Sequence, residues 1–145
     1  SDYPSWLKDI GLVIMCGCYA ALYGATLLEM FVAGIAAIVL PLVYKLDAKL
    51  GLGMFITNLV SIIPMVIIIC YLQETIFPSI HIGIPIIGAI MPAVPGTAIT
   101  NAIRDTLRGD YNSGTARAVE AAVTALSISI AVVIGLLIGG GVNPL

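Results

Sequence analysis

The chain has 145 residues, of which 60% are hydrophobic and only 10% are charged, and its formal net charge is −2. Soluble domains carry about a quarter charged residues, so this composition, with a mean hydropathy of +1.12, indicates an all-α integral membrane protein. The sequence has no basic cluster, and we expect no nucleic-acid partner. The chain is too short to enclose a transport path alone, so we expect one helical bundle that assembles with a partner.

Enzyme and metal chemistry find no support in the sequence. The motifs HExxH and GxSxG are absent, and no cysteine–histidine or paired-carboxylate spacing suits catalysis. Cys16, Cys18 and Cys70 lie in apolar runs without a nearby histidine, so we interpret them as membrane-buried thiols and predict no metal and no cofactor. The chain begins Ser-Asp-Tyr without an initiator Met, and we expect a processed product or a fragment.

Apolar runs of membrane length recur along the chain and predict a five-span bundle. Because a span needs about 20 apolar residues, we place the five spans at residues 10–23, 26–44, 51–72, 80–98 and 115–139. Tyr3 to Asp9 is an expected interfacial lead-in, Lys45 to Lys49 a short loop, and Gln73 to Ser79 a turn. Small residues at four-residue spacing predict close helix contacts in the first and last spans: Gly17, Ala21 and Ala25, and Gly135 and Gly139.

The fourth predicted span contains a proline step. Pro92 and Pro95 remove backbone N–H groups and break or bend a helix. Irregular backbone at membrane depth is tolerated only where it faces protein or a watery cavity, which in transporters is typically the substrate site. We therefore predict a broken fourth helix with a site at the break.

Two polar stripes follow this step. On the helix that restarts at Gly96, the residues at helical spacing are Thr97, Asn101, Arg104 and Arg108, with Thr100 and Asp105 beside them and Gly109 as the expected C-cap. On the fifth span they are Ser113, Arg117, Glu120, Thr124 and Ser127. Lipid does not solvate polar side chains, so we expect the two stripes to face each other inside the bundle.

Four other polar residues leave alternatives open. Glu29 is either an interfacial, solvated acid or a protonatable carboxylate that faces a cavity. Asn58 and Ser61 share a helix face and either bond a neighbouring helix or line the cavity. His81, the only histidine, is either a polar end residue or a proton relay.

The positions of Lys and Arg predict the orientation. Lys8 precedes the first span, Lys45 and Lys49 follow the second, and the three arginines lie between the fourth and fifth. Under the positive-inside tendency, this places the N-terminus inside and the C-terminus outside the cytoplasmic (inner) cell membrane, in a multi-pass arrangement. A second half with an odd number of spans would be inverted relative to the first, as in many secondary transporters.

The stretch around the proline step also resembles a known family. PAVPG at residues 92–96, TNAIRD at 100–105, GDYNSG at 109–114, then Arg117 and Glu120, are similar to the signature of the threonine/serine exporter family, as is LYGA at 22–25. Two departures are Ala93, where a larger apolar residue is expected, and Tyr111–Asn112 in the GD–SG turn. The resemblance implies an amino-acid exporter or antiporter for threonine, serine or small carboxylates, driven by the proton-motive force.

We predict that the chain is half of a ten-helix transporter unit. Its partners would be a small polar substrate, membrane lipid and a second five-span half or subunit, or copies of itself in a homo-oligomer. The predicted substrate site comprises Pro92, Pro95, Gly96, Thr97, Thr100, Asn101, Arg104 and Asp105. The predicted coupling network comprises Glu29, Asp110, Ser113, Arg117, Glu120 and Thr124. The alternative is a structural or assembly subunit without a substrate site, whose charged loop binds a cytoplasmic partner.

Overall fold

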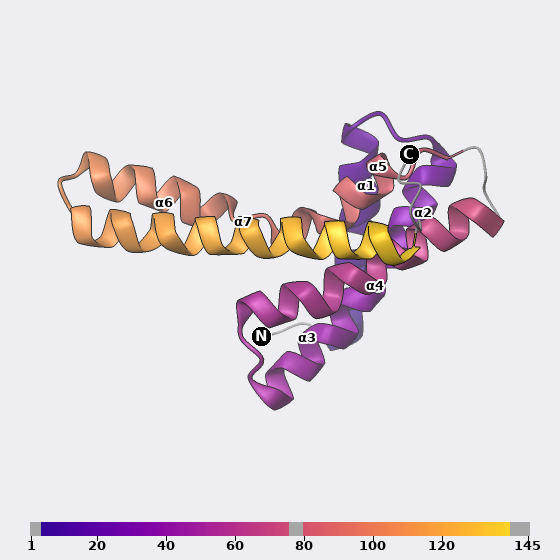
Figure 1. The fold of residues 1–145 in the computed structure, drawn as a ribbon, viewed down its shortest axis with the longest axis horizontal. Coiled ribbons are helices and arrows are strands. Elements are labelled where there is room, and N and C mark those ends of the chain that lie inside the picture. The colour runs from indigo at the N-terminus through magenta and orange to yellow at the C-terminus, as the bar shows by residue number, and fades with distance from the viewer. Residues whose placement is uncertain (1–3, 76–79, 140–145) are drawn as a thin grey trace.

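The computed structural model describes residues 4–75 and 80–139, without the side chains of Ser5 and Thr97, and every regular element in this part of the chain is helical (Figure 1). In chain order the elements are α1 (Ser5–Leu22), α2 (Leu27–Ala37), α3 (Val39–Leu50), α4 (Met54–Thr75), α5 (Gly83–Ile90), the 3-10 turn η1 (Met91–Ala93), α6 (Gly96–Leu107) and α7 (Tyr111–Gly139). The expected all-α architecture is therefore confirmed. Tyr3, Pro78 and Ser79, which belong to the predicted lead-in and turn, lie outside the described residues.

Three helices of the described part are long and apolar enough to cross a membrane. They are the continuous pair α2–α3 over Leu27–Leu50, α4 over Met54–Thr75, and α7 over Tyr111–Gly139. A fourth candidate arises if the bent pair Gly83–Ala93 and Ala98–Leu107 is counted as one span. The helix α1, predicted as the first span, is not among these candidates, so three or four spans are supported and the count of five stays a prediction.

Several helix ends differ from the predicted boundaries. The residues of the predicted 45–49 loop belong to α3, because Lys, Asp and Ala are all compatible with helix. The turn lies instead at Gly51 and Gly53, whose φ angles of 64° and 83° suit glycine alone. Similarly, α1 already contains the predicted lead-in residues from Trp6 to Asp9, and α4 continues through Gln73 to Thr75.

The helical path is interrupted at the two prolines. The helix α5 ends at Ile90, η1 holds Pro92, and Pro95 is the N-cap residue of α6. The segments on either side are inclined to each other by 54°. At the other end, Arg108 and Gly109 close α6 in a Schellman motif, in which the Gly109 N–H bonds Thr106 O and the Asp110 N–H bonds Asp105 O. Gly109, with φ of 86°, is thus the helix-ending residue that its type predicts.

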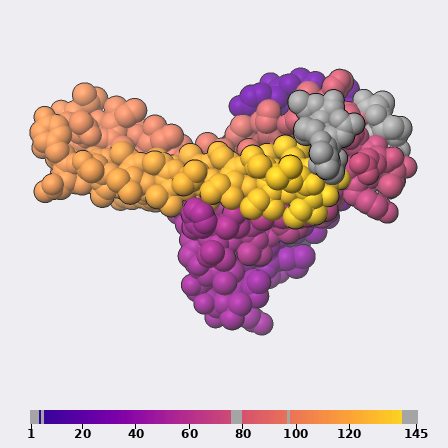
Figure 2. Space-filling view, viewed as in Figure 1, coloured from indigo at the N-terminus to yellow at the C-terminus, as the bar shows by residue number. Residues whose placement is uncertain are grey.

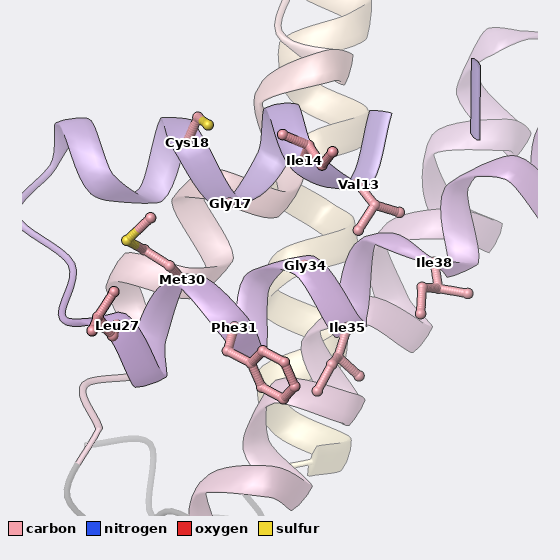
Figure 3. Close-up of a pocket in the computed structure, with 10 residues that line it drawn as sticks. All are labelled: Val13, Ile14, Gly17, Cys18, Leu27, Met30, Phe31, Gly34, Ile35 and Ile38. Atoms are coloured by element: carbon pink, nitrogen blue, oxygen red, sulfur yellow. The ribbon is translucent and has the colours of Figure 1, made fainter. Parts of the chain in front are cut away.

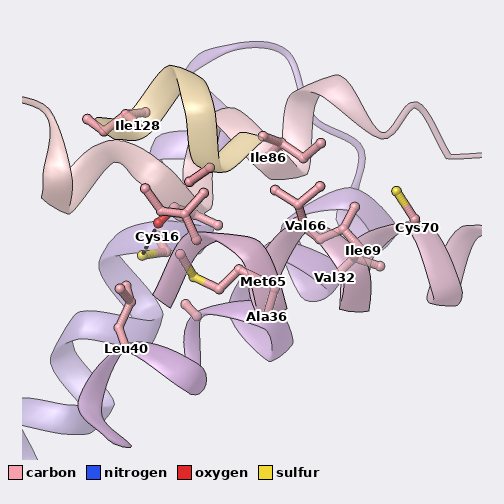
Figure 4. Close-up of a cluster of buried hydrophobic side chains, with 14 of the residues drawn as sticks. Cys16, Val32, Ala36, Leu40, Met65, Val66, Ile69, Cys70, Ile86 and Ile128 are labelled. Carbon is pink, nitrogen blue, oxygen red and sulfur yellow. Dashed lines mark hydrogen bonds between the residues drawn. The ribbon is translucent and has the colours of Figure 1, made fainter. Parts of the chain in front are cut away.

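In the described residues, one apolar core joins α1, α2, the first turn of α3, α4, α5 and the distal half of α7 (Figure 4). Its fully buried side chains include Cys16, Val32, Met65 and Ile69. The helices α1 and α5 approach closely at Gly88 of α5, where an added Cβ would lie 2.7 Å from Cys16 O of α1. The close-contact face of α1 is therefore formed by Cys16 and Ala20. The predicted face was wrong for Ala21, which is exposed, and for Ala25, which lies outside α1.

The helices α4 and α7 run parallel along this core. Asn58 bonds Ser127, Val66 lies against Gly135 and Cys70 lies against Gly139, and each pair is separated by 69 positions. Both glycines predicted to pack closely do so, since added Cβ atoms would lie 2.7 Å from Val66 Cβ and 3.1 Å from Cys70 Cβ. Parallel packing means that α4 and α7 begin on the same side of the bundle.

The proximal part of α7 extends past the start of α4 and pairs there with α6. Thr124 contacts Met54 at the beginning of α4, so residues 111–122 have no α4 neighbour at their level. At 1.5 Å per residue, this overhang is about 18 Å long. We call residues 96–122 the arm; it projects from the other helices in both views (Figures 1 and 2).

Candidate functional site

The predicted substrate site lies where the arm meets the core. Pro92 and Pro95 are half-buried at this junction, and Gly96 is exposed at the first position of α6. An added Cβ at Gly96 would meet no atom of the described chain within 4 Å, so the backbone there is open to an approaching group. No side chain caps this end of α6, but the Gly96 N–H already donates to Val94 O at 2.9 Å. The predicted free N–H groups therefore do not include that of Gly96.

Farther along α6, the polar residues are divided between neighbours and solvent. Arg104 Nη2 donates to Asn101 Oδ1 at 3.0 Å on the exposed side, and Thr100 is exposed. Asp105 is half-buried and accepts a 2.7 Å hydrogen bond from the Ser113 hydroxyl of α7. Within the part of the chain that the structure describes, the Asp105–Ser113 bond is the side-chain hydrogen bond by which the two predicted stripes meet.

The rest of the α7 stripe does not face α6 as predicted. Arg117 and Glu120 pair along their own helix at 3.4 Å, with 49% and 41% of their side chains exposed. Thr124 and Ser127 are buried, but against α4. The stripe changes neighbours because α6 ends its contact with α7 near the level at which α4 begins. Asp110 has a local role, since its Oδ1 accepts the Ser113 N–H at the first turn of α7.

Glu29 belongs to a separate polar cluster at the start of α2. The carboxylate is 1% exposed and accepts the Thr26 N–H at 2.9 Å, while the Thr26 hydroxyl accepts the Glu29 N–H. This reciprocal pair is a capping box. The other carboxylate oxygen of Glu29, Oε2, accepts the His81 backbone N–H at 2.8 Å and lies 3.4 Å from His81 Nδ1. Of the two alternatives for Glu29, the solvated acid is wrong.

The predicted coupling residues thus fall into three places. Glu29 lies at the start of α2, Thr124 at the α4–α7 contact, and Asp110, Ser113, Arg117 and Glu120 in the arm. Figure 1 shows the tip of the arm well away from α2. They do not form one continuous network in this chain.

Two grooves of the described chain lie in the bundle wall; the one between α1 and α3 has Asp9 and Lys45 at its edge, and the other is apolar. The apolar one, of about 570 Å³, lies between α1 and α2 and is lined by Gly17, Gly34 and larger apolar side chains such as Met30 and Phe31 (Figure 3). Such a lining offers few hydrogen-bond partners to a polar metabolite. A small polar substrate is therefore better matched by the junction near Gly96 than by this groove.

Two contacts were not predicted from the sequence. The Thr26–Glu29 capping box has a signal in the printed sequence, Thr-x-x-Glu before an apolar run. By contrast, the Asn58–Ser127 hydrogen bond of 2.8 Å joins residues 69 positions apart, and no local pattern carries that pairing. Of the alternatives for Asn58, it supports a bond to a neighbouring helix.

Comparison with known proteins gives the family. No curated protein and no solved structure matches the chain. A family model does match, over residues 1–139, and its description is "Putative threonine/serine exporter" (ThrE). The match covers the core, the junction at Gly96 and the whole arm. The chain is therefore a membrane protein of the ThrE family of threonine/serine exporters.

Proposed function

We propose that the chain is one half of a secondary exporter for threonine, serine or similarly small carboxylates, with its substrate site at the junction of η1 and α6. The observation that carries this proposal is the open backbone at Gly96, at an end of α6 that no side chain caps. The amino end of a helix has a partial positive charge and favours a carboxylate. Thr100 and Asn101 follow one turn later and supply groups that bond hydroxyl and amino substituents.

The proposal includes the proton-motive force as the drive and Glu29 as the coupling group. A buried carboxylate beside an exposed histidine provides a proton acceptor with a route to solvent. The second half would be a partner subunit or another copy of the chain. Family membership supports export as the activity. The alternative of an assembly subunit is favoured by one observation, the exposure of Arg117 and Glu120.

The substitution Gly96→Leu tests the site. Apart from its chain neighbours and its own helix backbone, nothing lies within 4 Å of a Cβ built at this position, so we expect the larger side chain to be accommodated and to obstruct a ligand at the backbone. We expect substrate binding to be lost in purified, correctly assembled protein. The matched control is Gly83→Leu, because Gly83 is also an exposed first residue of a helix with an open Cβ position.

Binding is measured on both variants in proteoliposomes, together with substrate uptake. If Gly96→Leu binds substrate as well as Gly83→Leu does, the site is elsewhere. If Gly96→Leu fails to assemble, the prolines serve helix packing instead. Uptake that never exceeds that of empty liposomes, even with the partner half present, would favour the assembly-subunit alternative.

A further inference from the structure

The two grooves of the bundle wall run together along α1. The groove between α1 and α3, of about 360 Å³, and the groove between α1 and α2, of about 570 Å³, share the lining residues Val13, Ile14 and Ile38. Figure 3 shows Val13 and Ile38 at one end of the second groove and Cys18 and Leu27 at the other. The two therefore form one continuous groove, which we call the α1 groove, from the start of α1 to the start of α2.

Glycines bring the helices together beneath the α1 groove. A Cβ added at Gly17 of α1 would lie 3.4 Å from Met30 O of α2, and one added at Gly34 would lie 3.6 Å from Val13 Cγ1. The two helices thus touch where neither glycine has a side chain, and this contact is the floor of the groove. The walls are exposed aliphatic side chains, among them Ile10, Ile14, Ile38 and Leu42. Such a lining suits a hydrocarbon chain.

The α1 groove lies at membrane depth. One of its walls is the candidate span Leu27–Leu50, whose 24 residues rise about 36 Å, more than the about 30 Å of hydrocarbon in a bilayer. The charged residues that end α3 and the exposed ring of Trp6 at the start of α1 mark the headgroup level. The end of the groove at Asp9 and Lys45 therefore lies beside lipid headgroups, and the rest lies beside acyl chains.

The headgroup end of the groove carries one charge of each sign. Lys45 Nζ lies 3.3 Å from Asp9 Oδ2, and 62% and 33% of the two side chains are exposed. Because the pair has no net charge, it favours a headgroup that is also neutral overall and holds both charges. An ammonium has three N–H donors and a carboxylate about four acceptor sites, so each can bond a headgroup while the ion pair persists. A phosphate suits Lys45, and a primary ammonium, unlike a quaternary one, can donate to Asp9.

We propose that the α1 groove binds a phospholipid with an ethanolamine headgroup, whose phosphate bonds Lys45, whose ammonium bonds Asp9 and one of whose acyl chains lies along the groove. Half of the hydrocarbon thickness is about 15 Å, or about ten residues of a helix. The acyl chain therefore extends from Lys45 past Ile38 to the level of Ile35. The lipid site is separate from the substrate site at Gly96, so each can hold if the other fails its test.

Headgroup preference is measured by native mass spectrometry of the full chain, offered equal amounts of phosphatidylethanolamine, phosphatidylcholine and phosphatidylglycerol with identical acyl chains. We expect about tenfold more bound ethanolamine lipid than either of the others, the effect of one hydrogen bond to a charged group. In Lys45→Gln this preference should be lost. Lys49→Gln is the matched control and should keep it, because Lys49 is an exposed lysine of the same helix that lines neither groove.

Three results of this measurement would overturn the proposal. The first is equal binding of the three lipids by the wild type, and the second is equal behaviour of the two lysine variants. The third is a preference for the glycerol lipid, which would show an anion bound at a lysine and refute the pairing of both headgroup charges.

A second measurement locates the acyl chain without changing the charges. An ethanolamine phospholipid with a photoreactive group midway along one acyl chain is reconstituted with the assembled protein, and the residues to which it attaches are mapped. We expect attachment within the α1 groove, which Ile14→Trp should abolish by filling the groove. Leu7→Trp is the control, because Leu7 is an exposed residue of α1 that lines neither groove. Attachment spread over all lipid-facing helices, or a groove covered by a second chain in the assembled protein, would refute the site.

Discussion

At the residue scale, whether a charged side chain is buried or exposed depends on its hydrogen-bond partners as much as on its type. The sequence predicts the Arg117–Glu120 pair as inward-facing and leaves Glu29 either solvated or facing a cavity. In the structure Glu29 is buried and hydrogen-bonded, whereas the pair is about half exposed. An exposed ion pair contributes only about 0–1 kcal/mol. Loss of either member therefore leaves no buried, uncompensated charge, and we expect little effect of either substitution on stability.

The substitution Glu29→Gln separates structure from coupling. The two carboxylate oxygens accept one N–H each, from Thr26 and His81, and glutamine can replace only one of them as an acceptor. We expect a loss of about 1–3 kcal/mol of unfolding free energy. If Glu29 carries the proton, export driven by an imposed pH gradient should also cease, while exchange of substrate without a gradient persists.

Thermal unfolding and transport are measured on the same preparation. Glu74→Gln is the control, since Glu74 is an exposed carboxylate at the end of α4. Gradient-driven export that survives in Glu29→Gln would limit this residue to its capping role.

At the scale of elements, the helices were largely predictable and their neighbours were not. The helices and several of their ends could be predicted from the length of the apolar runs, the proline step and Gly109, because each of these signals is local. The continuation of α3 to Leu50 was missed because charged residues suggested a loop, although they are compatible with helix. The change of neighbour along α7, from α6 to α4, depends on contacts between distant residues, such as Asn58 with Ser127.

Packing between α4 and α7 should be sensitive to single methyl groups. In Gly135→Ala the new Cβ would lie 2.7 Å from Val66 Cβ, closer than such atoms approach, so the helices must separate. Overpacking of this kind costs about 1–3 kcal/mol. We expect a lower melting temperature in detergent. Gly11→Ala, at an open and exposed helical position of α1, should leave it unchanged or raise it.

For the whole molecule, the contacts between helices bear on how the chain is oriented across the membrane. The parallel contact of α4 with α7 requires these two helices to cross in the same direction, as the predicted orientation also has it. The ion pair of 3.3 Å between Lys45 and Asp9 holds the end of α3 near the start of α1, which agrees with both lying inside. If the bent pair of α5 and α6 counts as one span, the structure has four candidate spans, and a crossing by α1 would give the five that the sequence predicts.

Cysteine labelling of single-cysteine variants tests whether α1 crosses the membrane. With Cys16, Cys18 and Cys70 replaced by alanine, we expect positions 48 and 112 to react from the inside, position 4 also from the inside, and position 23 from the outside. All four positions lie in the described chain, and the control is labelling after permeabilisation. If positions 4 and 23 react from the same side, α1 does not cross and the five-span arrangement is wrong.

The α4–α7 contact has a consequence for movement. The helix α7 has a small residue at each turn of the face that packs on α4. These residues are at least half-buried: Ser127, Ala131, Gly135 and Gly139. If α7 slid along α4 by one turn, about 5.4 Å, a small residue would again lie opposite each of Ile62, Val66 and Cys70. Packing alone therefore barely distinguishes the observed register from the shifted one. The hydrogen bond between Asn58 and Ser127 does distinguish them, because this one-turn slip leaves the buried Asn58 amide opposite Val123, whose side chain cannot accept a hydrogen bond. In a protein that works by helix movement, this hydrogen bond favours the observed register of α4 and α7 over the register shifted by one turn.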